Sequence, residues 1–258
     1  MGIKFQFLGT CAANFSPRLK DECANRFDMN ARRSSCALLD GHILIDCGIH
    51  TLDCLRIAGI SHDSITDVVL THLHADHFIA ENVRSIAAAK KEPLRLWVSE
   101  EAKFPEMANV EIVRMPKLER LELEEGVFVT GLFTNHDQSS APQILLFELG
   151  GKKILYATDG GWVINASYNF LKKSDLDLLV LDCTCGDYLG EYRIGEHNSI
   201  PMIRLMLPSL KTVGIISDKT EVYCTHIAPS LHKPHDEICA TVGEFGAKVA
   251  YDGLEIEI

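Results

Sequence analysis

The feature that most constrains this chain is the run Thr71–His77, which follows a short apolar stretch and holds three histidines and one aspartate. In an extended segment side chains alternate between faces, so His72 and His74 point the same way and can bind one ion together. Asp76 and His77 come where the chain must turn, which allows them to face a second ion. The spacing therefore predicts a binuclear metal site at the end of a strand.

The side chains of this run also narrow the choice of metal. Imidazole and carboxylate suit zinc, manganese or iron, whereas clusters of oxygen ligands alone suit magnesium or calcium. The alternative is a polar strand-to-helix turn with chance histidines, but four ligand-type residues at this density disfavour it. We expect two divalent metal ions, zinc or manganese, with iron left open.

The spacing of His72, His74, Asp76 and His77 resembles the H-x-H-x-D-H signature of the metallo-β-lactamase superfamily. This resemblance implies an α/β fold, an αββα sandwich of two mixed β-sheets flanked by helices. It also implies further ligands at the ends of apolar runs elsewhere in the chain. Three such runs end at a suitable residue: His136, Asp159 and His226. Each of these alone is more often a solvated or core residue, but together they are far less readily explained by chance.

The resemblance also assigns roles to these residues. It places His72, His74 and His136 on the first ion, Asp76, His77 and His226 on the second, and Asp159 between the two. Asp46, at the end of another apolar run, is implied to orient a ligand histidine without binding metal. The implied chemistry is hydrolysis by a metal-bridging hydroxide, in which Asp76 and Asp159 take part as ligands.

Within the superfamily, the sequence most resembles phosphodiesterases that act on cyclic phosphates, the phosphoribosyl 1,2-cyclic phosphate phosphodiesterase group. The opening Phe7-Leu8-Gly9-Thr10 is similar to that group and to tRNA 3′-end-processing endonucleases. Asp46-Cys47-Gly48-Ile49-His50 and Leu181-Asp182-Cys183-Thr184, followed by Glu196-His197-Asn198, are similar to the cyclic phosphodiesterases. The resemblance implies that His197 protonates the leaving group. A helix-capping or surface role for His197 is equally compatible with the sequence.

The nine cysteines are scattered and odd in number, which favours reduced, buried thiols in a cytoplasmic protein over a disulfide framework. In Cys183-Thr184-Cys185, strand alternation predicts that one thiol faces inward, and the spacing is not that of a zinc knuckle. The cyclic phosphodiesterases that the sequence resembles often carry a cysteine-rich structural zinc site after the first strand. Here Cys23 with His232 or His235 could form a structural zinc site with fewer cysteines. Two solvated histidines are the favoured alternative.

The net charge of −11 disfavours nucleic acid as a partner, because such binding draws on clustered Lys and Arg. A small phosphate ester fits better, since the metals would supply positive charge locally. No apolar run approaches the roughly 18 residues that span a membrane, so no membrane partner is expected. A homodimer is left open.

The 258 residues are predicted to form one hydrolase domain over residues 1–258, with no linker or clear repeat. The longest irregular stretch, residues 10–33, is predicted to be a loop near the site. Apolar spacing predicts helices near residues 50–58, 77–90, 163–173, 198–207 and 235–245. Strands are predicted near residues 3–8, 35–40, 43–47, 67–71, 94–98, 110–114, 126–135, 143–149, 152–157, 177–182, 221–225 and 247–251.

The sequence thus predicts a binuclear metal-dependent hydrolase, with a phosphodiesterase of small phosphate esters, cyclic ones included, favoured. A tRNA 3′-end-processing-type endoribonuclease shares the ligand set but conflicts with the acidic charge. A thioesterase or lactonase would direct the same hydroxide at a carbonyl carbon. A redox module with a binuclear iron centre is the least favoured alternative.

Overall fold

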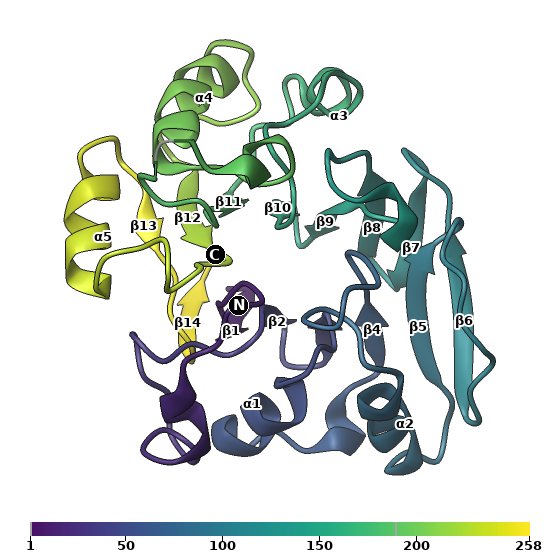
Figure 1. Cartoon of the computed structure of the whole chain (residues 1–258). Coiled ribbons are helices and arrows are strands. Elements are labelled where there is room, and N and C mark those ends of the chain that lie inside the picture. Colours follow the sequence, from purple (N-terminus) through teal and green to yellow (C-terminus); the bar gives the residue numbers. More distant parts are fainter. Residues whose placement is uncertain (1, 189) are drawn as a thin grey trace. The chain divides into compact units, whose positions relative to one another are not determined.

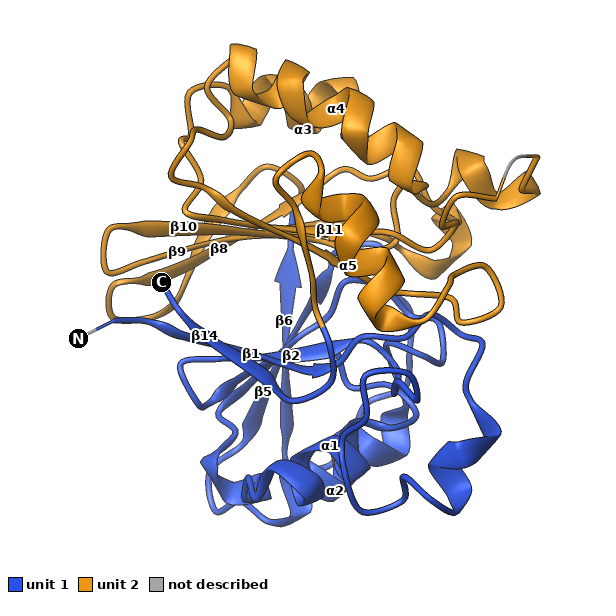
Figure 2. Ribbon diagram, turned by 90° about the vertical axis from the view of Figure 1, so that its left-hand side faces the viewer, with its two compact units in different colours: residues 1–116, 251–258 blue, residues 117–250 orange. Residues whose placement is uncertain are grey.

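The computed structural model describes residues 2–188 and 190–258, which form two compact units (Figures 1 and 2). Unit 1 comprises residues 1–116 and 251–258, and unit 2 comprises residues 117–250. The last strand of the chain therefore returns to the sheet in which the first strand lies. The prediction of one domain over residues 1–258 stays a prediction.

Unit 1 contains a mixed seven-stranded sheet in the order β14-β1-β2-β3-β4-β5-β6. The strands from β14 to β3 pair antiparallel, and those from β3 to β6 pair parallel. Helices α1 and α2 lie on one face of this sheet (Figure 2). The strands are β1 (Lys4–Gly9), β2 (Cys36–Leu39), β3 (Ile43–Ile45), β4 (Asp67–Val69), β5 (Leu94–Ser99), β6 (Val110–Met115) and β14 (Leu254–Glu257). The helices are α1 (Thr51–Ala58) and α2 (Ala80–Ala88), with 3₁₀ turns η1 (Pro17–Lys20) and η2 (His62–Ser64).

Unit 2 repeats this pattern with strands in the order β13-β12-β11-β10-β9-β8-β7. Antiparallel pairing from β7 to β10 gives way to parallel pairing from β10 to β13. The strands are β7 (Arg120–Glu124), β8 (Val127–Leu132), β9 (Ile144–Leu149), β10 (Lys152–Ala157), β11 (Leu178–Asp182), β12 (Glu221–Thr225) and β13 (Lys248–Val249). The helices are α3 (Asn165–Leu171), α4 (Ile200–Thr212) and α5 (His235–Gly243), with 3₁₀ turns η3 (Gln138–Ser140) and η4 (Tyr192–Gly195).

The parallel half of each sheet positions the predicted site residues. Parallel strands have their carboxyl ends at the same edge, where the loops that leave them can carry functional side chains. In unit 1, Asp46 follows β3 and the run Thr71–His77 follows β4 closely. In unit 2, Asp159 follows β10 and His226 follows β12. Residues distant in sequence therefore meet at one sheet edge within each unit.

Helix α4 illustrates how the sequence forms the core of unit 2. It begins at a Ser199 N-cap, whose hydroxyl accepts a hydrogen bond from the Met202 amide, and Pro201 stands in its first turn. Its apolar face, which includes Ile203 and Leu210, is buried against the strands in one hydrophobic cluster. The helix thus covers the sheet while the loop before it carries His197.

The twelve predicted strands and five predicted helices are all present, with small shifts at their ends. The predicted strand over residues 126–135 ends at Leu132, because the chain leaves the sheet there. Helix α2 begins only at Ala80, because Ile79 has an extended backbone (φ −126°, ψ 113°) and its amide donates to the Cys47 carbonyl. Strands β7 and β14 were not predicted, although both alternate apolar and charged residues. Among the described residues, no helix has the length and apolar composition needed to cross a bilayer.

The cysteines are free, and only Cys239 is not fully buried. The expectation of one inward thiol in Cys183-Thr184-Cys185 is wrong, since both thiols are buried. Alternation puts residues two apart on the same face, so it gives no reason for these two thiols to differ in burial. Both follow the end of β11, and the Cys185 amide donates to the Asn198 carbonyl.

A buried polar network ties the long loop of unit 1 to Asp252, just before the last strand. Thr10 Oγ1 donates to Asp252 Oδ1 over 2.8 Å, and the Arg33 amide donates to Asp252 Oδ2 over 2.6 Å. The Arg32 guanidinium also donates to Thr10 Oγ1 over 2.6 Å. Burial nevertheless raises the pKa of Asp252 to about 6, because these partners only partly offset the loss of solvent.

This network predicts a specific dependence of stability on pH. The pKa of Asp252 in the folded chain, about 6, lies above the ordinary value of 3.8, so the folded state holds the proton more tightly. Raising the pH from 4 to 7 should therefore lower the free energy of unfolding, by on the order of 2–3 kcal/mol from this group. Asp252→Asn should lack this component. Urea denaturation of both proteins across this range measures it, and parallel pH profiles would contradict it.

Candidate metal centre

In unit 1, a buried carboxylate fixes the orientation of His77. His77 Nδ1 donates to Asp46 Oδ2 over 2.7 Å, and both side chains are fully buried. The Thr71 amide and hydroxyl hold the other oxygen, Asp46 Oδ1, at 2.8 and 2.9 Å. With its Nδ1 proton so engaged, His77 presents Nε2 as the lone-pair nitrogen, which is the arrangement that metal-binding histidines use.

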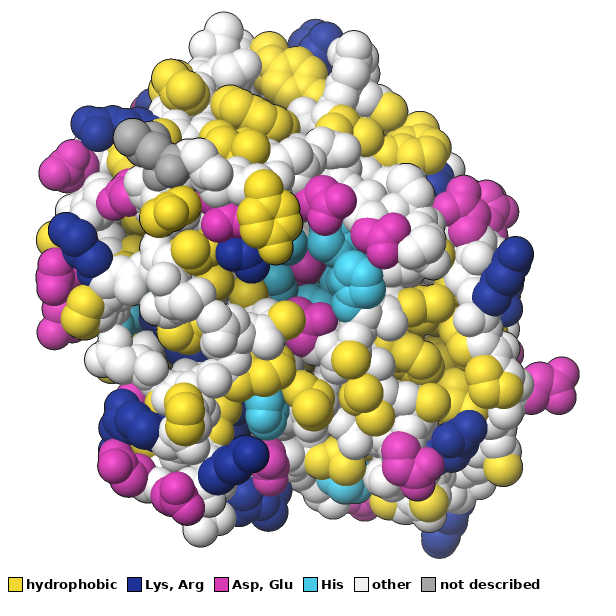
Figure 3. All heavy atoms as spheres, in the orientation of Figure 1, with side chains coloured by type: hydrophobic (Ala, Val, Ile, Leu, Met, Phe, Trp, Pro, Cys, Tyr) yellow, Lys and Arg dark blue, Asp and Glu magenta, His cyan; other side chains and the backbone are white. Residues whose placement is uncertain are grey.

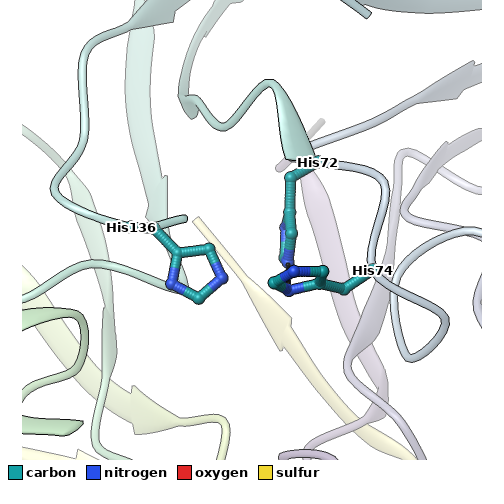
Figure 4. A group of neighbouring side chains, drawn as sticks. All are labelled: His72, His74 and His136. Atoms are coloured by element: carbon teal, nitrogen blue, oxygen red, sulfur yellow. Dashed lines mark hydrogen bonds between the residues drawn. The ribbon is translucent and has the colours of Figure 1, made fainter. Parts of the chain in front are cut away.

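His72 and His74, which are two residues apart in the chain, lie against each other (Figure 4). His72 Nε2 is 3.1 Å from His74 Nδ1. Two imidazole nitrogens on one tetrahedral ion, each bound at about 2.0–2.1 Å, would lie roughly 3.3 Å apart. The pair therefore has a separation that suits ligands of a single ion. His136, also drawn in Figure 4, comes from the loop after β8 in unit 2.

The turn that carries Asp76 and His77 packs closely on the loop after β3. The Cys47 amide donates to the His77 carbonyl over 2.7 Å, and the Ile49 amide donates to the Ala75 carbonyl over 3.0 Å. A Cβ atom at Gly48 would lie 1.8 Å from the Asp76 carbonyl oxygen. Glycine is therefore required at this position, and it sets where Asp76 and His77 stand. Asp76 Oδ2 lies 3.4 Å from His77 Nε2.

In unit 2, Asp159 stands between two histidines. Its Oδ1 lies 3.7 Å from His136 Nε2, and its Oδ2 lies 3.2 Å from His226 Nε2. All three side chains are buried. Each carboxylate oxygen thus faces a different imidazole, as expected for a carboxylate shared between two ions.

Asp182, to which the sequence assigned no role, is the most connected residue of this cluster. Its Oδ2 accepts a hydrogen bond from His197 Nδ1 at 2.9 Å and lies 3.1 Å from His226 Nδ1. Its Oδ1 accepts from the amides of Thr184 and Asn198 at 3.1 and 2.9 Å. Asp182 therefore fixes the two imidazoles as Asp46 fixes His77. Its signal in the sequence was its place at the end of an apolar run, the same signal that identified Asp159.

The pKa values of the two buried carboxylates, Asp46 and Asp182, are shifted in opposite directions. Burial raises the pKa of Asp46, and His77 offsets only part of that effect. Burial also acts to raise the pKa of Asp182, but the imidazoles of His197 and His226 outweigh it and lower that pKa. Conversely, burial acts to lower the pKa of His197, and the Asp182 carboxylate reverses this and raises it. The unit 2 cluster therefore favours a charged carboxylate beside a histidine that readily holds a proton.

Backbone strain marks the same positions. Asp46, Asp159 and His226 have φ angles of 65°, 54° and 57°, in the left-handed region that residues other than glycine seldom adopt. Such conformations persist where surrounding contacts impose them, and they concentrate at functional sites. Three residues selected from the sequence as site residues thus share this conformation with several turn residues such as Asp40 and Asn109.

Each predicted site residue belongs to one of two groups. Unit 1 brings together His72, His74, Asp76 and His77 with Asp46, and unit 2 brings together His136, Asp159, His197 and His226 with Asp182. In unit 2, four residues each place a ligand atom within 4.8 Å of all the others: Asp159, Asp182, His197 and His226. His197 therefore lies inside the cluster.

The histidines weighed for a structural zinc are not both solvated. His235 is buried and its Nε2 lies 3.4 Å from Cys239 Sγ, so the expectation of a solvated side chain is wrong for it. His232 is half-buried and its Nε2 donates to the Cys183 carbonyl over 2.6 Å. Cys23 is buried in unit 1. A structural metal site on these residues stays an untested alternative.

The basic side chains are dispersed. On the face shown in Figure 3, most Lys and Arg side chains are scattered, and those grouped at the lower left lie among Asp and Glu side chains. This distribution agrees with the net charge of −11 and offers no extended basic surface on that face.

Comparison with known proteins identifies the fold. A family model described as anti-Pycsar protein Apyc1 matches residues 3–103, less than half of the chain. A search of curated proteins found no match. Among solved structures, the metallo-β-lactamase fold protein YhfI from Bacillus subtilis is 16% identical with a TM-score of 0.74, covering 99% of both chains.

Two further solved structures are similar over nearly their whole length. A diphosphatase from the PhnP family is 23% identical with a TM-score of 0.74, covering 100% of this chain and 98% of its own. Human tRNase Z, short form, is 18% identical with a TM-score of 0.68, covering 98% of both chains. The chain therefore has the metallo-β-lactamase fold, as the sequence predicts, with two mixed seven-stranded sheets and flanking helices.

The contact between Asp182 and His197 predicts a shift that can be measured without any activity. Asp182→Asn removes the charge that raises the pKa of His197, so that pKa should fall below its wild-type value. The NMR titration of the His197 ring protons in metal-free protein reports it. Asp187→Asn, a change in the same loop, serves as the control. An unchanged titration of His197 in Asp182→Asn would contradict the contact.

Proposed function

We propose that this chain, which has the metallo-β-lactamase fold, is a binuclear metal-dependent hydrolase of small phosphodiesters. The observation that carries the proposal is Asp159, whose two oxygens face His136 and His226 separately. A carboxylate placed in this way can be shared by two ions. We propose that the groups of both units together supply the ligand set: His72, His74 and His136 for one ion, Asp76, His77 and His226 for the other, and Asp159 for both.

The donor chemistry fits divalent zinc, manganese or iron. The proposed ligands are five imidazoles and two carboxylates, a mixture that these metals prefer. Three features of the residues support this fit: the 3.1 Å separation of the His72 and His74 nitrogens, and the Nδ1 contacts of His77 and His226 with Asp46 and Asp182. The last two leave Nε2 as the ligand nitrogen in both histidines. When bound, two such ions supply an acidified water and neutralise charge on a phosphoryl group.

The chain's own residues then do two things. Asp46 and Asp182 hold the imidazoles in one tautomer and one orientation, which reduces reorganisation during the reaction. The pKa of His197 is raised, so this side chain readily carries a proton. Its Nδ1 is anchored on Asp182, which leaves Nε2 to deliver a proton to the departing oxygen. His197 Nδ1 is also 4.0 Å from Asp159 Oδ1, which puts it beside the proposed shared carboxylate.

A small phosphate ester is the proposed substrate. The chain is acidic overall, and a small anion needs positive charge only at the metals. The similar diphosphatase of the PhnP family carries phosphate chemistry on this fold. The reduced cysteines favour a cytoplasmic location, which we propose together with this function.

The rival activities differ in what they cleave. An endoribonuclease of the tRNase Z type would bind tRNA with a strong dependence on salt, and a thioesterase or lactonase would cleave acyl esters but not phosphodiesters. A binuclear iron redox module would be coloured and hydrolytically inert. Protein reconstituted with zinc, manganese or iron, assayed against cyclic phosphates, linear phosphodiesters, phosphomonoesters, thioesters and tRNA, separates these classes.

Removing a proposed ligand should abolish hydrolysis without unfolding the chain. We expect His72→Ala and Asp159→Ala each to lower kcat/KM by at least about a thousandfold, because the nucleophile and the charge neutralisation are both lost. Phosphodiesterase assays and metal analysis of the purified proteins test this. His62→Ala and Asp218→Ala, which change residues outside both groups, are the matched controls. Full activity in either ligand variant would exclude the proposed centre.

His197→Ala should retain its metal and lose turnover selectively. Loss of a proton donor slows departure of a poor alkoxide far more than departure of a nitrophenolate, which needs no proton. We expect kcat to fall by about 10²–10⁴ for an alkyl ester and much less for a nitrophenyl ester. Equal loss on both esters would show that His197 has another role.

A further inference from the structure

Three loops around the unit 2 cluster carry exposed apolar side chains. Phe133, Trp162 and Ile194 are 38%, 45% and 45% exposed, so each can contact a bound molecule. Each lies three residues from a member of the cluster: His136, Asp159 and His197 respectively. We call these three side chains the apolar rim.

Hydrogen bonds and close approaches join the three loops. The Gly161 amide donates to the Asn135 carbonyl over 3.3 Å, and the Asn135 side-chain amide donates to the Gly195 carbonyl. A Cβ atom at Gly161 would lie 3.0 Å from the Gly195 carbonyl oxygen, so the absence of a side chain there allows the loops to meet. The loops that carry the apolar rim are therefore held together beside the cluster by these contacts.

Trp162 is the most constrained member of the rim. Its φ angle is 65°, a strained conformation for a bulky residue, and its amide donates to Asn198 Oδ1 over 2.8 Å. Asn198 is the neighbour of His197, and its own amide donates to Asp182 Oδ1. The backbone that carries the indole is thus tied to the carboxylate that orients His197 and His226. Such strain at an exposed tryptophan points to a role for the side chain outside the core.

We infer that Trp162 is a specificity-determining residue, on which a flat aromatic ring carried by the substrate stacks while the phosphodiester reacts at the adjacent cluster. An exposed indole on a constrained backbone offers a π-face to a planar ring, and stacking of this kind is common in the binding of bases. The part of a substrate that does not react supplies binding energy beside the reacting group, which is where the rim lies. The inference rests on the proposed function and names its substrate class: phosphodiesters with a planar ring.

Three ribose 3′,5′-cyclic phosphates that differ only at C1′ test the inference, because their leaving groups are the same. They carry adenine, phenyl or methoxy at that carbon. We expect wild-type kcat/KM to favour the two ring-bearing probes over the methoxy probe, and Trp162→Ala to reduce that preference by roughly five- to a hundredfold, mainly through KM. Preference for adenine alone would identify a nucleobase as the ring, and equal preference would identify any flat ring.

Two further variants separate stacking from a structural effect. Trp162→Phe keeps an aromatic face and should keep most of the preference. Phe170→Ala, which removes an aromatic side chain of similar exposure (42%) from α3, should leave the preference unchanged. An equal loss of kcat/KM on all three probes in Trp162→Ala, or an unchanged preference, would overturn the inference.

A binding measurement keeps the inference separate from the proposed hydrolysis. The chain has two tryptophans, and the other, Trp97, is buried. Titration of metal-free protein with the adenine probe should quench tryptophan fluorescence in the wild type and not in Trp162→Phe. Quenching without hydrolysis under any metal would reject the proposed function and keep the stacking role. Neither quenching nor ring preference would reject the stacking role itself.

Discussion

The contact on which the rest of the site depends is that of a buried carboxylate with imidazole nitrogens. Asp182 holds His197 and His226 through their Nδ1 atoms, and Asp46 holds His77 in the same way. Each contact fixes which nitrogen carries the proton and which way the ring faces. A buried charge without such partners would be strongly destabilising, so the carboxylates and the histidines maintain each other.

The two sheets explain how these contacts arise. Each unit pairs its first strands antiparallel and its later strands parallel, so several carboxyl ends lie at one edge. Asp46 follows β3 and Asp159 follows β10, which occupy the same position in their respective sheets, and both adopt positive φ angles. The two carboxylates differ in what they contact. Asp46 contacts Thr71 and His77 in the loop after the neighbouring strand β4, whereas Asp159 lies between histidines that follow β8 and β12.

Much of the fold could be predicted, because apolar periodicity is a local property. The predicted strands and helices are present, and the two strands that were missed, β7 and β14, lie at sheet edges where half of the residues face solvent. Helix α4 extends to Thr212 through Pro208, beyond the predicted end near residue 207, because packing of its apolar face outweighs the local signal. The prediction of a solvated His235 was wrong for the same reason, since burial is decided by tertiary packing.

The sequence by itself determined the donor set: which imidazoles and carboxylates are available, and that His72 and His74 share a side of the chain. Spacing along a strand fixes that much, because covalent geometry alternates the side chains. Only the tertiary structure decided that Asp182 orients His197 and His226, that Asp159 stands between His136 and His226, and that Trp162 is exposed beside them. These relations depend on the pairing of strands that are tens of residues apart, and no local pattern encodes the distances between their ends.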